Sequence, residues 1–340
     1  MIKSISLLAI ATAVLFFTGC DNRKNFEPTQ TFSSAAAIST HGRDAIKVGR
    51  DGVTFSNGQF LTRKGEGKIT LPDGFHFINQ SSSSILAAND SSEMLILNKS
   101  TGATIKRAKL SFPLISGAIH GGNVMYMLHN DVFGVYNISK GKSVVDAKVG
   151  QAFAIDTRVT NPILLGGGRL MAVPTLDGKL LLINPKNPKG AQGISIGSEN
   201  VFNNVIFLSS IGGKRIIAAT PRKLVSAAPG SNHKFEANIA DVVISGSTIY
   251  VLTQDGRVVK LSTSMKVLAQ KKFKFAQFLS IAYVGGKVYA LDKQGSLFVL
   301  NSSLTQSKVY KIDPVESYTF VAGSKMYVDD KVIDLTLLPL

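Results

Sequence analysis

The chain has 340 residues, one cysteine and no tryptophan, and 44% of its residues are hydrophobic. Its 38 Lys and Arg outnumber its 22 Asp and Glu, which gives a formal net charge of +16. A single cysteine excludes a disulfide framework, and a chain of this length buries enough apolar surface to fold without one.

Residues 1–19, MIKSISLLAIATAVLFFTG, have the order of a secretory signal peptide. Lys3 supplies the positive charge, an apolar stretch runs from about Ile5 to Phe17, and small residues follow. A stretch of about 13 apolar residues is shorter than the roughly 20 that a helix needs to cross a bilayer. We therefore expect this segment to be cleaved, which leaves a strongly basic mature chain.

The end of this segment, Phe17-Thr18-Gly19-Cys20, resembles the lipobox of bacterial lipoproteins. In that family a small residue precedes a cysteine that is acylated on sulfur before the signal peptidase cuts in front of it. The resemblance implies that Cys20 is the lipidation site, and several acyl chains on one residue make anchoring stable. The alternative is an ordinary secretory signal followed by a chance cysteine.

A lipid anchor predicts a protein of the cell envelope that faces the periplasm. The outer membrane is favoured, but Asp21 leaves the inner membrane open, because in enteric bacteria an aspartate at this position retains lipoproteins there. Secretion argues against nucleic acid as the partner of the basic chain. Anionic lipid head groups, peptidoglycan or an acidic protein face remain as its partners; the alternative is that the charge only keeps the protein soluble.

Residues 20–44 follow the signal as a polar segment rich in Ser, Thr and Ala, without helical or strand periodicity. We interpret it as the lipidated cysteine and a flexible tether.

From residue 45 to 340 a repeat of about forty residues organises the chain. Each unit has apolar residues, a Gly or Ser turn, and an alternating apolar strand; most continue into a second turn such as Asp177-Gly178, Asp255-Gly256 or Gln294-Gly295. The first turns end at Ser83, Gly122, Gly168, Gly213, Gly246, Gly286 and Ser324.

This period is that of a four-stranded propeller blade. We predict an all-β propeller domain over residues 45–340. An Asn-Gly turn in GVTFSNGQFLTRK raises the count to eight blades, with seven as the alternative. The last unit lacks an outer strand, so an N-terminal strand around Ala45 to Val53 is expected to complete it and close the ring.

The segment LNKSTGATIKRAKL, residues 97–110, resembles the PQQ-type propeller repeat, with Lys106 where that family carries a tryptophan. Together with the lipobox, the architecture is similar to the BamB family, lipoproteins of the outer-membrane β-barrel assembly machinery. The resemblance implies a non-catalytic scaffold. It does not extend to a cofactor, because quinone-binding members need a tryptophan and often a cysteine pair, and the chain lacks both.

Other motifs point to turns rather than chemistry. The five histidines, at positions 41, 76, 120, 129 and 233, lack metal-ligand spacing, so no metal site is expected. The glycine clusters at 166–168 and 212–213 precede strands, whereas a phosphate loop precedes a helix.

Four aspartates, Asp90, Asp177, Asp255 and Asp292, are expected on one rim, in or beside the turns between second and third strands. Turn chemistry explains them; the functional alternative is a rim that meets a protein partner, with Asp177 and Asp255 as the binding residues. For the whole protein, the alternative to a scaffold is a ligand-binding or enzymatic propeller that acts on cell-wall or carbohydrate material.

Overall fold

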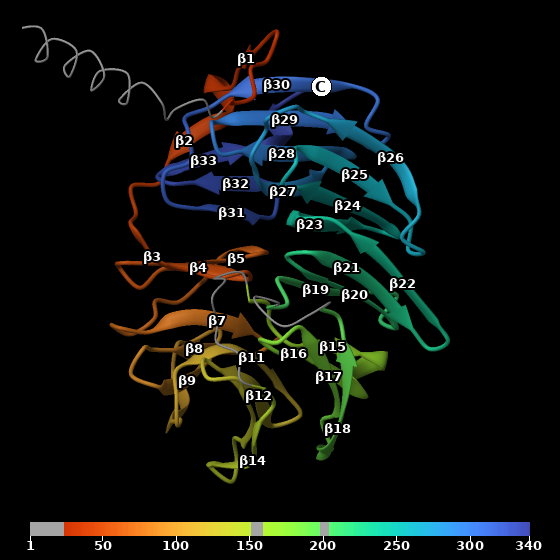
Figure 1. Ribbon diagram of the computed structural model, residues 1–340. Coiled ribbons are helices and arrows are strands. Elements are labelled where there is room, and N and C mark those ends of the chain that lie inside the picture. Colours follow the sequence, from red (N-terminus) through yellow and green to blue (C-terminus); the bar gives the residue numbers. More distant parts are fainter. Residues whose placement is uncertain (1–23, 151–158, 198–203) are drawn as a thin grey trace, which may run out of the picture.

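The computed structural model describes residues 24–150, 159–197 and 204–340, and within them the strands form eight sheets arranged as a propeller (Figure 1). Eight blades are thus confirmed over seven. We number the blades along the chain and call the four strands of each A to D in the order of the sheet. None of the helices described is long and apolar enough to span a membrane.

Blades 1 to 4 follow one another along the chain. Their strands are β3 (Ala45–Val48), β4 (Gly52–Phe55), β5 (Phe60–Thr62) and β6 (Gly65–Glu66); β7 (His76–Gln80), β8 (Ser84–Ala88), β9 (Glu93–Asn98) and β10 (Thr104–Lys109); β11 (Leu114–His120), β12 (Asn123–Leu128), β13 (Val132–Asn137) and β14 (Lys142–Lys148); β15 (Ile163–Leu165), β16 (Leu170–Pro174), β17 (Lys179–Asn184) and β18 (Asn187–Ser195).

Blades 5 to 8 complete the ring. Their strands are β19 (Phe207–Ile211), β20 (Arg215–Thr220), β21 (Lys223–Ala228) and β22 (Ser231–Glu236); β23 (Ile239–Ser245), β24 (Thr248–Thr253), β25 (Arg257–Leu261) and β26 (Val267–Lys272); β27 (Phe278–Val284), β28 (Lys287–Asp292), β29 (Ser296–Asn301) and β30 (Ser307–Lys311); β31 (Thr319–Ala322), β32 (Lys325–Val328) and β33 (Lys331–Asp334) with β2 (Ile38–Thr40). Strand β1 (Phe32–Ser33) and the short 3-10 elements Ala35–Ala37, Gly166–Gly168 and Leu335–Leu337 are the remaining elements.

The predicted turns lie where the repeat placed them. Those ending at Ser83, Gly122, Gly168, Gly213, Gly246, Gly286 and Ser324 separate strands A and B. Gly166, Gly167 and Gly168 have φ of 57°, 68° and 86°, so the short element at these residues is a left-handed turn and not a right-handed 3-10 helix. The A–B turn precedes strand B and the B–C turn follows it, so the two sets of turns lie on opposite sides of the propeller. We call these sides the A–B rim and the B–C rim.

In six blades a recurring hydrogen bond at the B–C rim ties the chain after strand D to the B–C turn of the same blade. A residue after strand D donates its N–H to the carbonyl of a positive-φ residue in the B–C turn, as Phe273 does to Gly256 over 2.7 Å. The other pairs are Leu71 to Gly58, Leu110 to Ser92, Val149 to Asp131, Ile196 to Gly178, and Ile312 to Gly295. Positive-φ turn residues, four of them glycines, therefore position the chain where it leaves these six blades.

An N-terminal strand closes the ring, as expected, but this strand is β2 and not the one expected around Ala45 to Val53. Strand β2 pairs antiparallel with β33, with Ile38 opposite Ile333, whereas Ala45–Val48 is strand A of blade 1 and Gly52–Phe55 its strand B. Strand β1 adds in parallel to β30 as a fifth strand of blade 7. The C-terminus also lies beside β30 (Figure 1).

The tether predicted for residues 20–44 is therefore wrong for the segment from Phe32 to Thr40. Ala37 is buried at 5% exposure, and Ser34 donates its hydroxyl hydrogen to Lys311 O over 2.7 Å. The segment gains backbone partners and a buried contact from residues nearly 300 positions away, which local periodicity does not reveal. Cys20 and the signal peptide over residues 1–19 lie outside the described residues.

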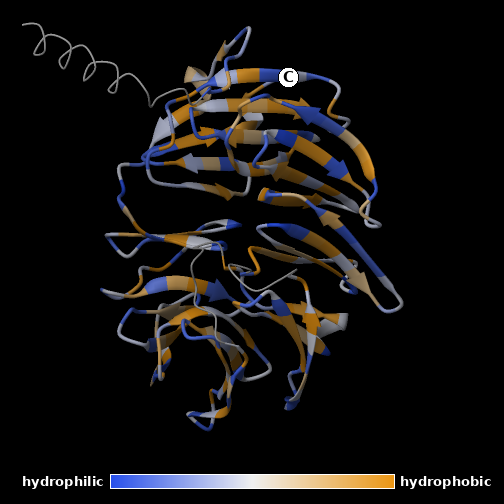
Figure 2. Ribbon diagram, in the orientation of Figure 1, coloured by the Kyte–Doolittle hydropathy of each residue, from blue (hydrophilic) through white to orange (hydrophobic). Residues whose placement is uncertain are grey.

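The core lies between the blades, where strands B and C are almost fully buried. Figure 2 shows hydrophobic stretches along these strands and hydrophilic stretches at many of the turns. Leu, Val and Ile dominate the clusters, so the packing between these blades is mainly aliphatic in a chain that has no tryptophan. Phenylalanine rings contact one another at two interfaces: Phe60 stacks on Phe77 with centroids 5.0 Å apart, and Phe273 lies 4.3 Å from Phe298.

Candidate functional site

The two aspartates proposed for partner binding lie on the B–C rim, in blades 4 and 6. Asp177 accepts a hydrogen bond from the Thr175 hydroxyl and forms an ion pair with Lys179. Asp255 repeats this arrangement with the Thr253 hydroxyl and with Arg257, whose Nε lies 2.9 Å from Oδ2. Burial would raise the pKa of Asp255, but the hydrogen bonds from Thr253 and Arg257 outweigh it and lower the pKa.

The sequence motif Thr-x-Asp-Gly-Lys/Arg thus builds the same turn twice. Its basic residue is exposed at 47% for the Lys179 side chain and 31% for Arg257, so each turn presents a cation beside a carboxylate. Both carboxylates stabilise their own turns, as Asp residues in tight turns do.

The other two rim aspartates differ from each other. Asp292 is fully buried and accepts N–H hydrogen bonds from Gln294 and Ser296. Its burial raises its pKa despite those bonds. Asp90 is 86% exposed and lies 3.4 Å from Lys47 of blade 1. The structure therefore places all four residues on the predicted rim, with Asp292 inaccessible to a partner.

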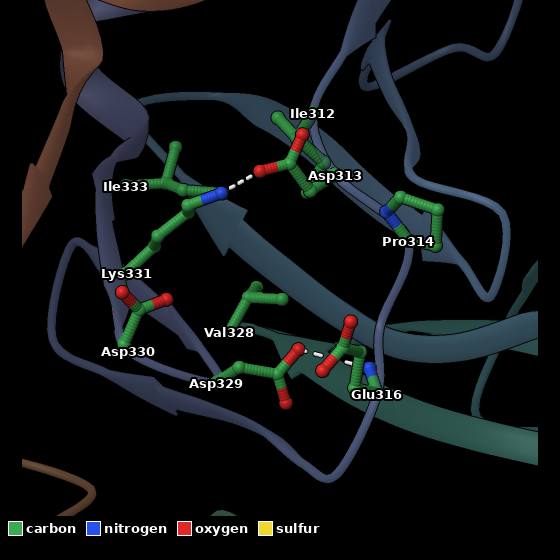
Figure 3. A pocket seen from close by; sticks show the side chains of 9 residues that line it. All are labelled: Ile312, Asp313, Pro314, Glu316, Val328, Asp329, Asp330, Lys331 and Ile333. Carbon is green, nitrogen blue, oxygen red and sulfur yellow. Dashed lines mark hydrogen bonds and ion pairs between the residues drawn. The ribbon is translucent and has the colours of Figure 1, made fainter.

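A small pocket of about 130 Å³ lies on the same rim where blade 7 connects to blade 8 (Figure 3). Lys331 forms an ion pair with Asp313, and Asp329 accepts the backbone N–H groups of residues 316, 317 and 318 over 2.8 to 3.0 Å. Burial would raise the pKa of Asp329, but these N–H groups outweigh it and lower the pKa. The carboxylates of Asp313 and Asp329 thus hold the connection between the blades (Figure 3), and the pocket is smaller than the roughly 300 Å³ at which ordinary ligand sites begin.

A polar cluster that sequence reasoning missed lies on the propeller axis, beside a cavity of about 440 Å³. Arg50, in the A–B turn of blade 1, donates to Asp241 of blade 6 over 2.5 Å and to Val242 O over 3.2 Å. The second oxygen of Asp241 accepts the N–H of Ile281 in blade 7 over 3.0 Å. The guanidinium of Arg50 lies 5.3 Å from the ring of Phe207 in blade 5.

Asn161 joins the remaining inner strands. Its Nδ2 donates to Asp51 of blade 1 over 2.7 Å and to Ile78 O of blade 2 over 2.8 Å. Its Oδ1 accepts the N–H of Gly117 in blade 3 over 2.9 Å. One amide side chain therefore links four blades, and with Arg50 and Asp241 the cluster holds blades 1 to 7 together.

Arg63 adds the eighth blade to this cluster. It donates to Val321 O over 3.3 Å, and its guanidinium lies 4.6 Å from the ring of Phe320. Burial and the nearby charge of Arg50 lower its pKa to about 10. The two arginines of the cluster are balanced by two aspartates, Asp51 and Asp241. Because its contacts join the blades of the ring, we interpret the cluster as a structural lock.

The histidines remain separate in the part of the chain that the structure describes. No group of three His, Cys, Asp or Glu residues there has the arrangement of a metal site. His76 is buried, and this burial lowers its pKa to about 4. His41 Nε2 lies 2.9 Å from Asp329 O and 3.3 Å from the Tyr318 hydroxyl.

Comparisons with known proteins agree with the propeller fold. No family model matches the chain. The plasminogen-binding protein PgbB of Helicobacter pylori strain J99 is 24% identical over 365 aligned positions, which cover 94% of this chain and 67% of that protein. The PgbB of strain 26695 is 23% identical with the same coverage.

Among solved structures, BamB from Moraxella catarrhalis aligns with a TM-score of 0.65 at 15% identity, over 87% of this chain and 94% of that one. The C-terminal WD40 domain of Sif2 gives 0.63 at 13% identity, over 91% of this chain and 100% of that domain. AztD from Citrobacter koseri gives 0.55 at 14% identity, over 80% and 87%. At these identities the likeness shows the fold alone.

Proposed function

We propose that this protein is a non-catalytic scaffold of the cell envelope, anchored by acylation of Cys20 and binding other proteins through the B–C rim. The observation that carries the proposal is the combination of a sequence that resembles a lipobox at Cys20 with an eight-bladed propeller similar to BamB over 87% of the chain. The turns around Asp177 and Asp255 present paired charges on that rim and are its proposed contacts.

A direct test is affinity purification from cross-linked envelopes. We expect recovery of an outer-membrane barrel-assembly protein, and a slower association at higher salt, because exposed charges are screened within about 8 to 10 Å at 0.1 to 0.15 M. Asp177→Lys should weaken the complex without loss of folding. The control is Lys214→Glu, an exposed charge reversal in a turn of the opposite rim. Recovery of only peptidoglycan fragments or a small ligand would overturn the scaffold proposal.

The anchor has its own test. Wild type should incorporate labelled fatty acid and fractionate with membranes, whereas Cys20→Ala should be found in the soluble periplasmic fraction or accumulate as precursor. Fractionation on a density gradient then assigns the inner or outer membrane. A wild-type protein that takes up no fatty acid would contradict the anchor.

A second partner is suggested by the relative named plasminogen-binding protein PgbB. The outer strands of several blades expose lysines, among them Lys109, Lys148, Lys234 and Lys272. Immobilised plasminogen tests this candidate. If exposed lysines make the contact, free lysine should compete; absence of binding would remove plasminogen as a partner and leave the envelope scaffold intact.

A further inference from the structure

The described part of the chain begins at the B–C rim, where blade 6 connects to blade 7. Phe26 packs into the aromatic core there, with its ring centroid 4.8 Å from Phe298 and 5.9 Å from Phe273. From this contact the chain continues to β1 on the outer edge of blade 7 (Figure 1). The N-terminal segment is therefore fixed to one side of the propeller from Phe26 onward.

The chain before this contact is short. Only four peptide units separate Cys20 from Lys24. At about 3.3 to 3.6 Å per residue they span at most roughly 14 Å. An acylated Cys20 would therefore hold the connection between blades 6 and 7 close to the lipid surface.

The surface at this place is basic and aromatic. Phe275 is 40% exposed, with Lys274 Nζ 5.0 Å and Lys24 Nζ 5.9 Å from its ring centroid. We call this surface the blade 6 patch, and it consists of Lys24, Lys271, Lys272, Lys274 and Phe275.

Few negative charges oppose the blade 6 patch. Asp255 lies 3.7 Å from Lys272, but it is already paired with Arg257. Glu27 is exposed on the N-terminal segment. The patch and Arg257 carry five positive charges against these two carboxylates.

The backbone at Phe275 is strained. Its φ is 71°, at the third position of a turn closed by the Ala276 N–H to Phe273 O hydrogen bond of 3.1 Å. Glycine or asparagine is favoured at such a position, and a bulky residue there costs about 1 to 3 kcal/mol. The connection between blades 1 and 2 has the same hydrogen bond, Phe75 N–H to Pro72 O, and there the third residue is Gly74 with φ 77°.

An exposed aromatic ring is thus kept at a position where this same protein uses glycine elsewhere. Aromatic rings favour the boundary between water and hydrocarbon, and lysines near an anionic lipid surface contribute about 1 kcal/mol each. We propose that the blade 6 patch docks on the anionic phospholipid surface of the membrane that holds the anchor. The orientation rests on the acylation of Cys20 in the proposed function, whereas the lipid affinity of the patch does not.

This orientation separates the two proposed partner contacts. The Asp255 turn adjoins the patch through Lys272 and through the Phe273 N–H to Gly256 O hydrogen bond. The Asp177 turn belongs to blade 4, two blades away around the ring. On the docked protein the Asp177 turn would then be the proposed protein contact farther from the lipid, and the Asp255 turn the nearer one.

Vesicle binding tests the patch without the anchor. The Cys20→Ala protein without residues 1–19 is floated with vesicles of phosphatidylethanolamine and phosphatidylglycerol, and with vesicles of phosphatidylcholine as the neutral comparison. We expect binding to the anionic vesicles only, weakened by salt. Lys274→Glu should reduce it at least about five-fold, which corresponds to the roughly 1 kcal/mol expected for one lysine.

Phe275→Gly is the most informative variant, because glycine suits φ 71° and the fold should be at least as stable as wild type. It should bind the anionic vesicles several-fold more weakly. The matched control is Phe112→Ala. Phe112 is 46% exposed in the connection between blades 2 and 3, four blades around the ring from Phe275. Absence of binding to anionic vesicles, or equal loss in Phe112→Ala and Phe275→Gly, would overturn the proposal.

Labels on the acylated protein test the orientation. Cys20 is the only cysteine, so Phe275→Cys and Phe112→Cys each add one free thiol for a fluorophore. Lipid-borne quenchers should quench the label at 275 and not at 112. Fatty acid uptake with an unquenched label at 275 overturns the orientation and leaves the scaffold proposal standing. Vesicle binding without fatty acid uptake supports the patch and removes the anchor.

Discussion

The guanidinium of Arg50 in blade 1 lies 2.5 Å from the carboxylate of Asp241 in blade 6, across the axis of the propeller. Their side chains are 12% and 8% exposed, so the pair is largely shielded from water. Asp241 also accepts the backbone N–H groups of Val242 and Ile281. This pair therefore fixes three blades at once, and its loss should be felt by the whole ring.

We predict that Asp241→Ala lowers the free energy of unfolding by about 3 to 5 kcal/mol, because it leaves the buried charge of Arg50 without its carboxylate partner. Asp241→Asn should cost less, since its amide oxygen still accepts one backbone N–H. Urea unfolding measures both. The control is Glu236→Ala, which breaks the exposed pair with Lys234 and should change stability by less than about 1 kcal/mol. An equal loss in Asp241→Ala and Glu236→Ala would contradict the lock.

A second prediction concerns Gly256 in the B–C turn of blade 6. A Cβ here would lie 2.3 Å from Phe273 O, the residue whose N–H bonds the Gly256 carbonyl. Gly256→Ala should therefore destabilise the protein by more than the roughly 1 kcal/mol that an unfavourable positive φ of 81° costs alone. Gly286→Ala is the control, with φ 80° and no atom within 4 Å of its Cβ. Thermal melts of both should differ; if they coincide, the close approach has no energetic effect.

The repeat could be predicted from sequence because its signals are local. A turn such as Asp255-Gly256 needs a positive φ, which few residues other than glycine adopt. Glycines therefore mark many of the turns between the strands of a blade. The axial cluster had no such signal. Arg50, Asn161 and Asp241 are each more than 70 residues from the next, and each alone has the composition of an ordinary turn or strand end. Only the curvature of the ring brings them together.

The closing strand was missed for a related reason. Ile38–Thr40 is a three-residue strand with one apolar side chain, too short for an alternating pattern. Its stability comes from β33, at the other end of the chain. We predict that deletion of residues 32–40 lowers the unfolding midpoint, because it exposes β33 and the outer edge of β30. Deletion of residues 335–340 should act similarly, since Tyr310 donates to Pro339 O over 2.6 Å. A melt like that of wild type after either deletion would contradict closure by these segments.

The last prediction concerns pH. Burial, together with the nearby charge of Lys47, lowers the pKa of His76 to about 4, below its ordinary value of 6.5. The unfolded chain therefore takes up a proton at a higher pH than the folded protein does. The stability contributed by neutral His76 is complete above about pH 6.5 and is lost as the pH falls towards 4.

Between pH 7.5 and pH 5 this loss should be on the order of 2 kcal/mol. Urea unfolding of wild type and His76→Gln at both values isolates it, because the carboxylates that titrate in this range are common to the two proteins. We expect the variant to be less stable than wild type at pH 7.5, since glutamine fills the site poorly, and to lose less stability on acidification. His233→Gln serves as the control, because His233 lies on the outer strand of blade 5 with a hydrogen bond to Ser231. If wild type and His76→Gln lose stability in parallel, burial of His76 does not set the acid sensitivity of the propeller.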